Sequence, residues 1–371
     1  MMNATSRKKE CCLLAVMVAF LLLVGSVICE AAAPAKAREL KWASQHSEAY
    51  FAMPAIKQYF IDKVEAYTKG AVKIKLYYGG QLAEVKDLPE LCRRGSVDMI
   101  STSAPYYPSL YPLTSTMIVF PMLFKGAEDA AYVWRALLRD VPEIQAEFAK
   151  QNQYCLNRAE LSAYLTLSKR PVRNLADFKG LKIRGMAGKY YFDLMASAGA
   201  VGLASPISEV YEGLMRGVLD AAMVNVQSIQ SMKFYEAAKY ISYNGGAGQA
   251  WFNAINLDVW KSFTPEIRKA FEQTATEWGA KHLELNLTTE KQSIEFLKGK
   301  GVQFIEFDKK DEEALNRGLK VGDPWVVAKD YLVKELKVDA AVADRFVKRW
   351  HELVNEYEQK YSSTGKKWEY K

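Results

Sequence analysis

Hydrophobic and polar positions follow two different periods along this chain of 371 residues. Leu40–Ala43, Val72–Tyr77 and Val97–Thr102 are short stretches with the apolar or two-residue pattern of strands. Tyr50–Thr68 and Asp87–Arg94 instead repeat apolar residues at helical spacing. The alternation of strands with helices predicts an α/β fold with an open sheet and crossover helices.

One seven-residue pattern occurs twice. Arg94–Ile100 corresponds to Arg216–Ala222, and in each copy a predicted helix ends at a glycine before an apolar strand that begins with aspartate. Glycine tolerates the left-handed conformation that often ends a helix. Upstream, Leu181–Ile183 precedes a predicted helix at Lys189–Ala198, as Leu40–Ala43 precedes a helix in the first half. We therefore expect two similarly built lobes, with chance similarity as the alternative.

Three further stretches, Val119–Phe124, Tyr154–Leu167 and Trp251–Ile255, are predicted to be strand-rich crossings between the lobes. A last amphipathic helix is predicted from Asp339 to Tyr361. Together with the alternating strands and helices, these crossings indicate that the chain passes from one lobe to the other more than once.

A long helix is predicted to begin at Pro265, behind the capping residue Thr264, and to run towards Lys298. At 1.5 Å per residue it would be roughly 50 Å long, enough to span both lobes. Its residues at spacings of three or four form one stripe: Ile267, Phe271, Thr274, Trp278, His282, Leu285, Thr289, Gln292 and Phe296. On this stripe His282 is expected to pack rather than to bind a ligand.

The amino terminus has the pattern of a secretory signal peptide. Arg7, Lys8 and Lys9 precede the apolar run Leu13–Val24, and three alanines ending at Ala33 provide a small-residue cleavage site. An uncleaved membrane anchor is the alternative, although the run is shorter than the roughly 20 residues that a spanning helix needs. We expect cleavage after residue 33 and export of the remaining chain.

Composition narrows the function. The net charge of +7 comes from interspersed acids and bases, without the basic block typical of nucleic-acid binding. After cleavage Cys92 and Cys155 remain, which is too few for a disulfide framework. His46, His282 and His351 are the three histidines of the sequence, which makes a multi-histidine metal site improbable. No nucleotide-binding, metalloprotease or serine-hydrolase motif occurs, so no cofactor, metal or catalytic residue is expected.

A binding site is expected where strands end. Ligands of open α/β sheets bind beyond the carboxyl ends of the strands. The predicted ends are Ser44–His46 and Ser101–Ser103 in the first lobe, and Arg184–Gly185 and Val224–Asn225 in the second.

A guanidinium can pair with a carboxylate through two hydrogen bonds, so Arg184 is either an anchor for an acidic ligand or a surface charge. A turn containing Gly185 is expected to let Arg184 project into the cleft. Tyr106, in a loop rich in tyrosine and proline, is expected either to line the pocket or to cover the core.

Several longer stretches resemble one family, the extracytoplasmic solute receptors of tripartite ATP-independent periplasmic (TRAP) transporters, in its dicarboxylate-receptor-like branch. The matching stretches are Tyr77–Leu88, Arg93–Met99, Leu175–Gly185, Pro206–Ala221 and Ser231–Ile241. The resemblance implies a two-lobed, periplasmic-binding-protein-like type II fold with a long helix crossing both lobes. It also implies a non-enzymatic receptor that binds a small organic acid and delivers it to a membrane permease.

The resemblance assigns site residues by position. The arginine of its GLKIR motif, which binds the substrate carboxylate, corresponds to Arg184. Gln45 and Ser103 fall at polar contact positions of the first lobe, and Ile207 at an apolar or aromatic wall. Two positions depart from the family: a second arginine found in some members is Tyr164 here, and a frequent asparagine falls at Val224, with Asn225 one residue later. A single arginine beside aromatic walls favours a monocarboxylate.

The predicted organisation is a signal peptide at 1–33, the first part of lobe I at 38–160 and of lobe II at 161–249, a return to lobe I at 250–288, and completion of lobe II with the C-terminal helices at 289–371. The expected mechanism is hinge closure around the acid, with the permease recognising the closed state. A periplasmic sensory protein, an ABC-type receptor and a periplasmic enzyme on the same fold are the alternatives. Homodimerisation through the C-terminal helices is a further expectation that stays open.

Overall fold

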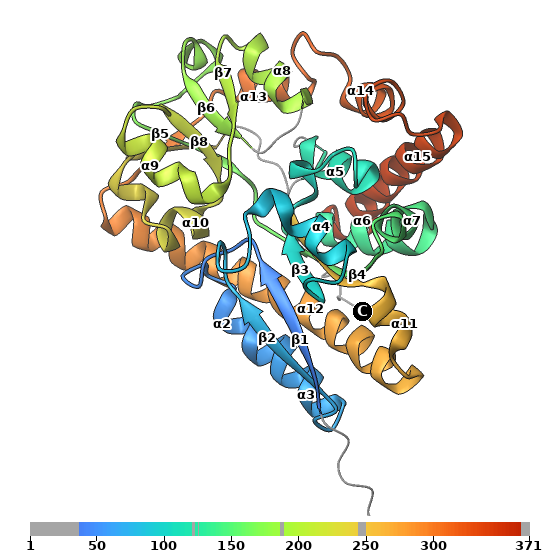
Figure 1. Ribbon diagram of the computed structural model, residues 1–371. Helices are drawn as coiled ribbons and strands as arrows, with labels where there is room; N and C mark the ends of the chain where they lie inside the picture. Colours follow the sequence, from blue (N-terminus) through green and yellow to red (C-terminus); the bar gives the residue numbers. More distant parts are fainter. Residues whose placement is uncertain (1–36, 121–122, 125, 186–188, 244–249, 365–371) are drawn as a thin grey trace, which may run out of the picture. The chain divides into compact units, whose positions relative to one another are not determined.

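The computed structural model describes residues 37–120, 123–124, 126–185, 189–243 and 250–364, and the described residues from Glu39 onward form one compact unit (Figure 1). Within that unit the strands form two mixed sheets. The first sheet has the order β2-β1-β3-β10-β4. Its strands are β1 (Arg38–Ser44), β2 (Val72–Tyr77), β3 (Met99–Thr102), β4 (Gln153–Glu160) and β10 (Ala250–Asn256).

The second sheet has the order β11-β9-β5-β8-β6-β7. Its strands are β5 (Leu165–Ser168), β6 (Lys182–Gly185), β7 (Val201–Ala204), β8 (Ala221–Val224), β9 (Tyr240–Tyr243) and β11 (Gln303–Glu306). Each sheet combines parallel pairs with one antiparallel strand: β10 lies antiparallel between β3 and β4, and β5 lies antiparallel between β8 and β9. The chain therefore passes from the first sheet to the second between β4 and β5, and returns at β10, as the sequence predicted.

Helices connect the strands along the chain. Short helical turns occur between them, of which η3 (Ala104–Tyr106) and η6 (Ile207–Glu209) matter below. A π-helical turn at Lys57–Ile61 separates α2 from α3 within the predicted helix at Tyr50–Thr68. The α-helices are α2 (Met53–Ile56), α3 (Asp62–Tyr67), α4 (Leu88–Arg93), α5 (Pro112–Val119), α6 (Ala127–Asp140), α7 (Glu143–Lys150), α8 (Lys189–Ser197), α9 (Val210–Met215), α10 (Val226–Ser231), α11 (Leu257–Ser262), α12 (Pro265–Gly299), α13 (Lys309–Asn316), α14 (Pro324–Asp330) and α15 (Ala340–Tyr357).

The long helix α12 contains 35 residues and packs against β4 of the first sheet and α10 of the second half (Figure 1). The Thr264 hydroxyl caps it by accepting from the backbone N–H of Ile267, and Pro265 occupies its first turn, as predicted. The predicted stripe is buried at Phe271, Trp278 and His282 but only half-buried or exposed from Leu285 onward. In the second half of α12 the buried positions are instead Leu283, Asn286, Ser293 and Leu297. The predicted stripe is wrong there about burial, because the polar Asn286 and Ser293 are buried whereas Leu285 and Phe296 are half-buried at the edges of the cores.

The internal repeat has a structural basis. Gly95 and Gly217 end their helices with φ of 75° and 77°, in the left-handed region. The next acid, Asp98 or Asp220, forms the same pair of bonds in both copies. The Asp98 carboxylate accepts from Lys41 N at 2.8 Å, and Asp98 N donates to Lys41 O at 3.0 Å. Asp220 and Lys182 make the same contacts, both at 2.9 Å. Each aspartate thus aligns one parallel strand with its neighbour, which confirms that the two halves are built alike.

The predicted strand at Val119–Phe124 is wrong. Val119 ends the helix α5, and Phe120, Leu123 and Phe124 belong to no strand; residues 121–122 lie outside the described part. Seven of the eight residues of α5 are buried. Phe120, Leu123 and Phe124 after it are buried as well, and an apolar run indicates burial without specifying a strand, which explains the error.

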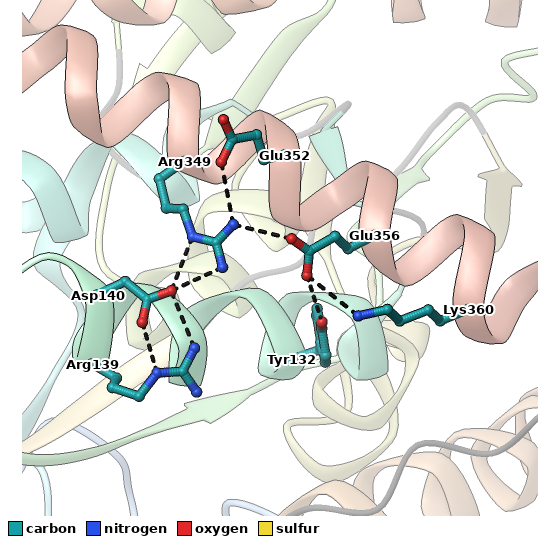
Figure 2. Close-up of polar contacts among 7 residues, drawn as sticks. All are labelled: Tyr132, Arg139, Asp140, Arg349, Glu352, Glu356 and Lys360. Carbon is teal, nitrogen blue, oxygen red and sulfur yellow. Dashed lines mark hydrogen bonds and ion pairs between the residues drawn. The ribbon is translucent and has the colours of Figure 1, made fainter.

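The C-terminal helix α15 packs on α6, with Trp350 and Phe346 in the shared hydrophobic core. Beside this packed face, an ionic network links polar side chains of the two helices (Figure 2). Arg349 is its centre. It donates to Asp140 at 2.9 Å, to Glu356 at 3.1 Å and to Glu352 at 3.2 Å. The outer members of the network are Arg139 on Asp140, and Tyr132 and Lys360 on Glu356.

Candidate functional site

Arg184 lies inside the second sheet, in β6, opposite Ala222 of β8 and Leu203 of β7. Its side chain is fully buried. Two backbone carbonyls of the neighbouring strands hold the guanidinium in place, one directly after β7 and one within β8. Nε donates to Ser205 O at 2.9 Å, and Nη1 donates to Met223 O at 3.2 Å. Arg184 therefore lies deep inside the protein, within β6, rather than at an open strand tip.

Two predicted tyrosines lie beside this guanidinium. Arg184 Nη2 donates to the Tyr106 hydroxyl at 3.3 Å, so η3, which follows β3 of the first sheet, contacts β6 of the second. Tyr164 is buried in the crossing between β4 and β5. Burial raises the pKa of the Tyr164 hydroxyl, and the adjacent positive charge of Arg184 opposes that rise. The Tyr164 phenol is therefore a neutral hydrogen-bonding group near neutral pH.

Gln45 and Ser103 come together at the ends of β1 and β3. The Gln45 side-chain carbonyl accepts from Ser103 N at 3.0 Å and from Thr102 Oγ1 at 2.9 Å. Its amide nitrogen lies 3.3 Å from the Ser103 hydroxyl, which in turn donates to Ala250 O at 2.9 Å. We call Gln45, Ser103, Tyr106, Tyr164 and Arg184 the arginine cluster.

The remaining predicted residues have different surroundings. Val224 is buried in the hydrophobic core around β8, where it pairs with Leu165 of β5. Ile207, the first residue of η6, packs on the same core. Asn225 caps α10 by accepting from Ser228 N at 3.1 Å. Although it comes one residue after Val224, Asn225 is fully buried and lies near the Tyr50 hydroxyl.

Four further side chains form what we call the aromatic box: His46, Tyr50, Trp251 and His282. The His46 and Tyr50 rings stack with centroids 4.1 Å apart, and the Trp251 ring lies 4.7 Å from each histidine ring. Burial raises the pKa of the Tyr50 hydroxyl well above its ordinary value; Tyr164 and Tyr106 add to the rise, and Ser228 and Asn225 oppose it. The box therefore adjoins the arginine cluster through Tyr50.

Sequence reasoning missed most of the aromatic box. His282 does pack among rings, as expected, but the stripe did not indicate its contact with Trp251 or its proximity to His46. The signal that was present is a histidine on a stripe that also carries large apolar residues. Tyr50 and Trp251 carry no such signal, because buried aromatic residues are common in cores.

The box is electrically neutral near neutral pH. Burial lowers the pKa of His46 to about 3, with the nearby His282 adding to the effect, and burial alone lowers the pKa of His282 to about 3. Among the described residues, four buried polar atoms here lack a hydrogen-bond partner: His46 Nδ1, Asn225 Nδ2, Trp251 Nε1 and His282 Nε2. Buried polar groups without partners are rare in folded proteins, and each is costly.

Gly185 has a different role from the one expected. It is part of β6, paired with Ala204, and its backbone does not adopt a positive φ. A side-chain Cβ at this position would lie 2.7 Å from a ring carbon of Tyr191 and 3.1 Å from one of Phe192. Glycine is thus required because two aromatic rings pack against the strand directly after Arg184. The turn that follows, at 186–188, lies outside the described residues.

Comparison with known proteins identifies relatives over most of the chain. The model of the family described as "Bacterial extracellular solute-binding protein, family 7" matches residues 43–321. A curated relative, the 2,3-diketo-L-gulonate-binding periplasmic protein YiaO of Escherichia coli, is 28% identical over 248 residues, which cover 66% of this chain and 74% of the relative. The sialic acid-binding periplasmic protein SiaP of Vibrio cholerae is 24% identical over 244 residues, 65% of this chain and 74% of its own.

Solved structures have the same fold. A TRAP periplasmic solute-binding protein from Xanthobacter autotrophicus, solved with bound β-D-galacturonate, superposes with a TM-score of 0.70 at 25% identity and covers 84% of this chain and 99% of its own. One from Desulfovibrio salexigens, solved with orotic acid, gives a TM-score of 0.74 at 21% identity, covering 86% and 99%. The predicted two-lobed α/β fold with its long helix is thereby confirmed.

Proposed function

Because the chain belongs to family 7 of the bacterial extracellular solute-binding proteins, we propose that it is a TRAP-transporter receptor that binds a small organic carboxylate through Arg184. The members of this family are solute-binding receptors and not enzymes. The names of relatives support the ligand class, since galacturonate and orotate are both carboxylates.

The observation that carries the proposal is a buried positive charge without a negative partner. Arg184 is 0% exposed, and among the described residues no carboxylate forms an ion pair with it. Arg158 of β4 is buried to a similar degree, but its guanidinium is held by both oxygens of Glu160, at 2.5 and 2.9 Å. An uncompensated buried charge costs several kcal/mol, so a site like that of Arg184 favours an anion.

The geometry leaves hydrogen-bonding capacity for that anion. A guanidinium has five N–H donors, and the bonds to Ser205, Met223 and Tyr106 use one on each nitrogen. The Tyr164 hydroxyl also bonds to Arg184, so a carboxylate would replace one or both phenols on the terminal nitrogens to form the two-bond arrangement. Two charge-assisted bonds of about 1.5–3 kcal/mol each would provide a large part of a micromolar affinity of about 8 kcal/mol.

The proposed mechanism is closure of two lobes on the ligand. We assign residues 38–160 and 250–288 mainly to lobe I, and residues 161–249 mainly to lobe II. Residues 289–371 complete lobe II and form the C-terminal helices, of which α15 packs on α6 of lobe I. Arg184 would come from lobe II, and Gln45, Ser103 and Tyr106 from lobe I. A carboxylate bound to residues of both lobes would stabilise the closed state, which the permease would then recognise.

Export is part of the proposal. We infer that residues 1–33 form a cleaved signal peptide and that the protein acts in the periplasm, as the names of its relatives indicate for them. Among the described residues, no helix is long and apolar enough to cross a membrane. A TRAP permease is the proposed membrane partner, and a dimer through the C-terminal helices remains a prediction.

The test is calorimetric titration of the purified protein with D-galacturonate, orotate and a panel of other small carboxylates, alongside Arg184→Lys. Lysine keeps the charge but cannot form the two-bond fork. We expect Arg184→Lys to weaken binding by about 10- to 150-fold, corresponding to the loss of one charge-assisted bond of about 1.5–3 kcal/mol. The control is Arg216→Ala, which removes an exposed arginine paired with Glu212 on α9 and should leave affinity unchanged. Equal affinity of wild type and Arg184→Lys for every acid would refute the anchor.

A further inference from the structure

One end of the second sheet carries a row of lysines. Lys239 directly precedes β9, Lys169 directly follows β5, and Lys182 is the first residue of β6. The register pairs β5 with β9 and with β8, and β8 with β6, so these three lysines lie in one row across the sheet. At about 4.8 Å between strands, the row from β9 to β6 is about 14 Å wide. Tyr164 of the arginine cluster directly precedes β5, so the cluster lies towards the opposite end of these strands.

Three further cations join this row through backbone contacts. Arg170 follows Lys169 in the chain, and its Nη2 donates to Lys179 O at 3.2 Å. Lys239 Nζ donates to Lys300 O at 3.1 Å. We call the whole set the basic pole: Lys169, Arg170, Lys179, Lys182, Lys239 and Lys300. Its members are spread over the second half of the sequence, so the fold gathers a basic surface that no block of the chain indicates.

The charges of the basic pole have no counterion within the protein. Among the described residues, no carboxylate forms an ion pair with any of its six side chains, whereas the neighbouring Arg216 is paired with Glu212. Asp220 is the acid of the row, and its carboxylate accepts from the backbone N–H of Lys182 at 2.9 Å. Every side chain of the pole except that of Lys182 is exposed, and the Lys182 ammonium donates to Gly217 O at 2.7 Å. The pole therefore presents a concentrated positive potential to its surroundings.

Exposed aliphatic side chains border the same end of the sheet. Val201 is paired with Lys182 in the register. Val218 follows Gly217, the residue whose carbonyl accepts from the Lys182 ammonium. Val201, Met215 and Val218 are 53%, 57% and 58% exposed, which makes them three of the four most exposed large apolar side chains among the described residues. Their position beside unpaired cations indicates a surface that contacts something both anionic and apolar.

The chemistry of this surface distinguishes between anionic partners. Lysine ammonium groups are point charges that attract phosphates without a fixed geometry, unlike the guanidinium fork of Arg184. An anionic polysaccharide would satisfy the charges but offers no apolar layer for the three aliphatic side chains. A membrane of anionic phospholipids offers both, since aliphatic side chains can insert at the boundary between headgroups and acyl chains.

We propose that the basic pole and the three aliphatic side chains beside it dock on the anionic phospholipid surface of a membrane. This goes beyond the proposed function and does not depend on which acid is bound. Because the pole and the arginine cluster lie towards opposite ends of the strands, docking leaves the ligand-binding end free. The contact would keep the receptor close to the membrane that holds its permease.

The experiment is flotation of the purified protein with vesicles of phosphatidylcholine alone, or of equal parts of phosphatidylcholine and phosphatidylglycerol. We expect binding to the acidic vesicles that falls steeply as salt is raised to about 1 M, and little binding to the neutral ones. Lys169→Ala, Lys182→Ala and Lys239→Ala together should weaken binding to the acidic vesicles about 100-fold, at about 5-fold for each lysine. Equal binding to both kinds of vesicle, or binding to neither, would overturn the proposal.

Two controls isolate the surface from net charge and from other polyanions. Lys57→Ala, Lys261→Ala and Lys269→Ala together remove three exposed lysines elsewhere and lower the net charge by the same amount. An equal loss in this variant would overturn the assignment of the pole, because net charge alone would then explain the effect. Val218→Ser should weaken binding to the acidic vesicles about 5-fold but leave binding to dextran sulfate unchanged. No effect of Val218→Ser on the vesicles would overturn the lipid assignment, and tight binding of dextran sulfate would then identify the partner as an anionic polymer.

Discussion

Acid should destabilise this protein through the two histidines of the aromatic box, and His282→Phe should remove about half of that effect. Burial lowers the pKa of both His46 and His282 to about 3, whereas a histidine in an unfolded chain has a pKa of about 6.5. Between these values the unfolded chain binds more protons than the folded chain. The free energy of unfolding contributed by each histidine is therefore fully present above pH 6.5 and falls as the pH falls towards 3.

The magnitude follows from the difference between the folded and unfolded pKa values. Each pH unit within the window changes the free energy of unfolding by about 1.4 kcal/mol for each histidine. Lowering the pH from about 7.5 to about 5 should therefore cost roughly 2 kcal/mol for one histidine and roughly 4 kcal/mol for both. A native protein is stable by about 5–15 kcal/mol, so this loss is easily measured.

A buried carboxyl group acts in the opposite direction. Glu147 of α7 accepts from Leu113 N at 2.8 Å and from Thr114 N at 3.0 Å at the start of α5, and also from the Thr114 hydroxyl. Burial raises the pKa of Glu147 to about 7, against the opposing effect of these hydrogen bonds. Its contribution to stability is therefore present below about pH 4.5 and lost as the pH rises through 7, so acidification to about pH 5 should add roughly 2 kcal/mol.

The assay is urea denaturation of wild type, His282→Phe and Glu147→Gln at several values between about pH 7.5 and about pH 5. Phenylalanine preserves the ring packing against Trp251 but cannot titrate. His282→Phe should reduce the acid-induced loss of stability by roughly 2 kcal/mol, and Glu147→Gln should increase that loss by a similar amount. A pH dependence in His282→Phe that is the same as in wild type would refute the reasoning, as would a smaller loss in Glu147→Gln.

Two further predictions concern the ionic network around Arg349 and the packing at Gly185. Arg349→Ala should lower the free energy of unfolding by about 1–2 kcal/mol, because it removes the centre of the network between α6 and α15 in Figure 2. The loss should be smaller at high salt, and urea titrations at low and high salt measure it. An effect no larger than that of Arg216→Ala would contradict the prediction. Gly185→Ala should lower the free energy of unfolding by about 1–3 kcal/mol and weaken carboxylate binding, because the added Cβ would lie 2.7 Å from a ring carbon of Tyr191. Gly299→Ala is the control, since a Cβ there would have no atom within 4 Å. Equal stability of the two variants would contradict the prediction.

Much of the fold could be predicted because its elements are regular and have distinct end signals. The repeated glycine and aspartate around Gly95 and Gly217 mark a helix end and the alignment of a parallel strand, and both features recur in the structure. Thr264 and Pro265 likewise fixed the start of α12. In each case a short-range requirement of the backbone selects the residue type, so the sequence carries the information locally.

The errors occur where a buried position is polar, or where a buried apolar run does not form a strand. The stretch from Val119 to Phe124 is apolar throughout, and an apolar run indicates burial without specifying a strand. The second half of α12 buries Asn286, whose carbonyl groups accept from Gln227 of α10 at 2.9 and 3.0 Å. A pattern search that equates buried with apolar cannot find such a face, because its burial depends on a partner far away in the sequence.

The same reasoning explains why Arg184 could be predicted and the aromatic box could not. Arg184 stands out in the sequence because a charged residue ends an apolar strand, whereas His46 and His282 become informative only when the fold brings them to one tryptophan. Arg158 shows that burial alone does not indicate function, since Glu160 neutralises it within its own strand. What distinguishes a binding site from a core is the polar group that the protein itself does not pair. Arg184 has no carboxylate partner among the described residues, and three ring nitrogens of the box have no hydrogen-bond partner there. A receptor built in this way is less stable empty than it would be with a fully satisfied interior, and the ligand that completes its hydrogen bonds also stabilises its closed state.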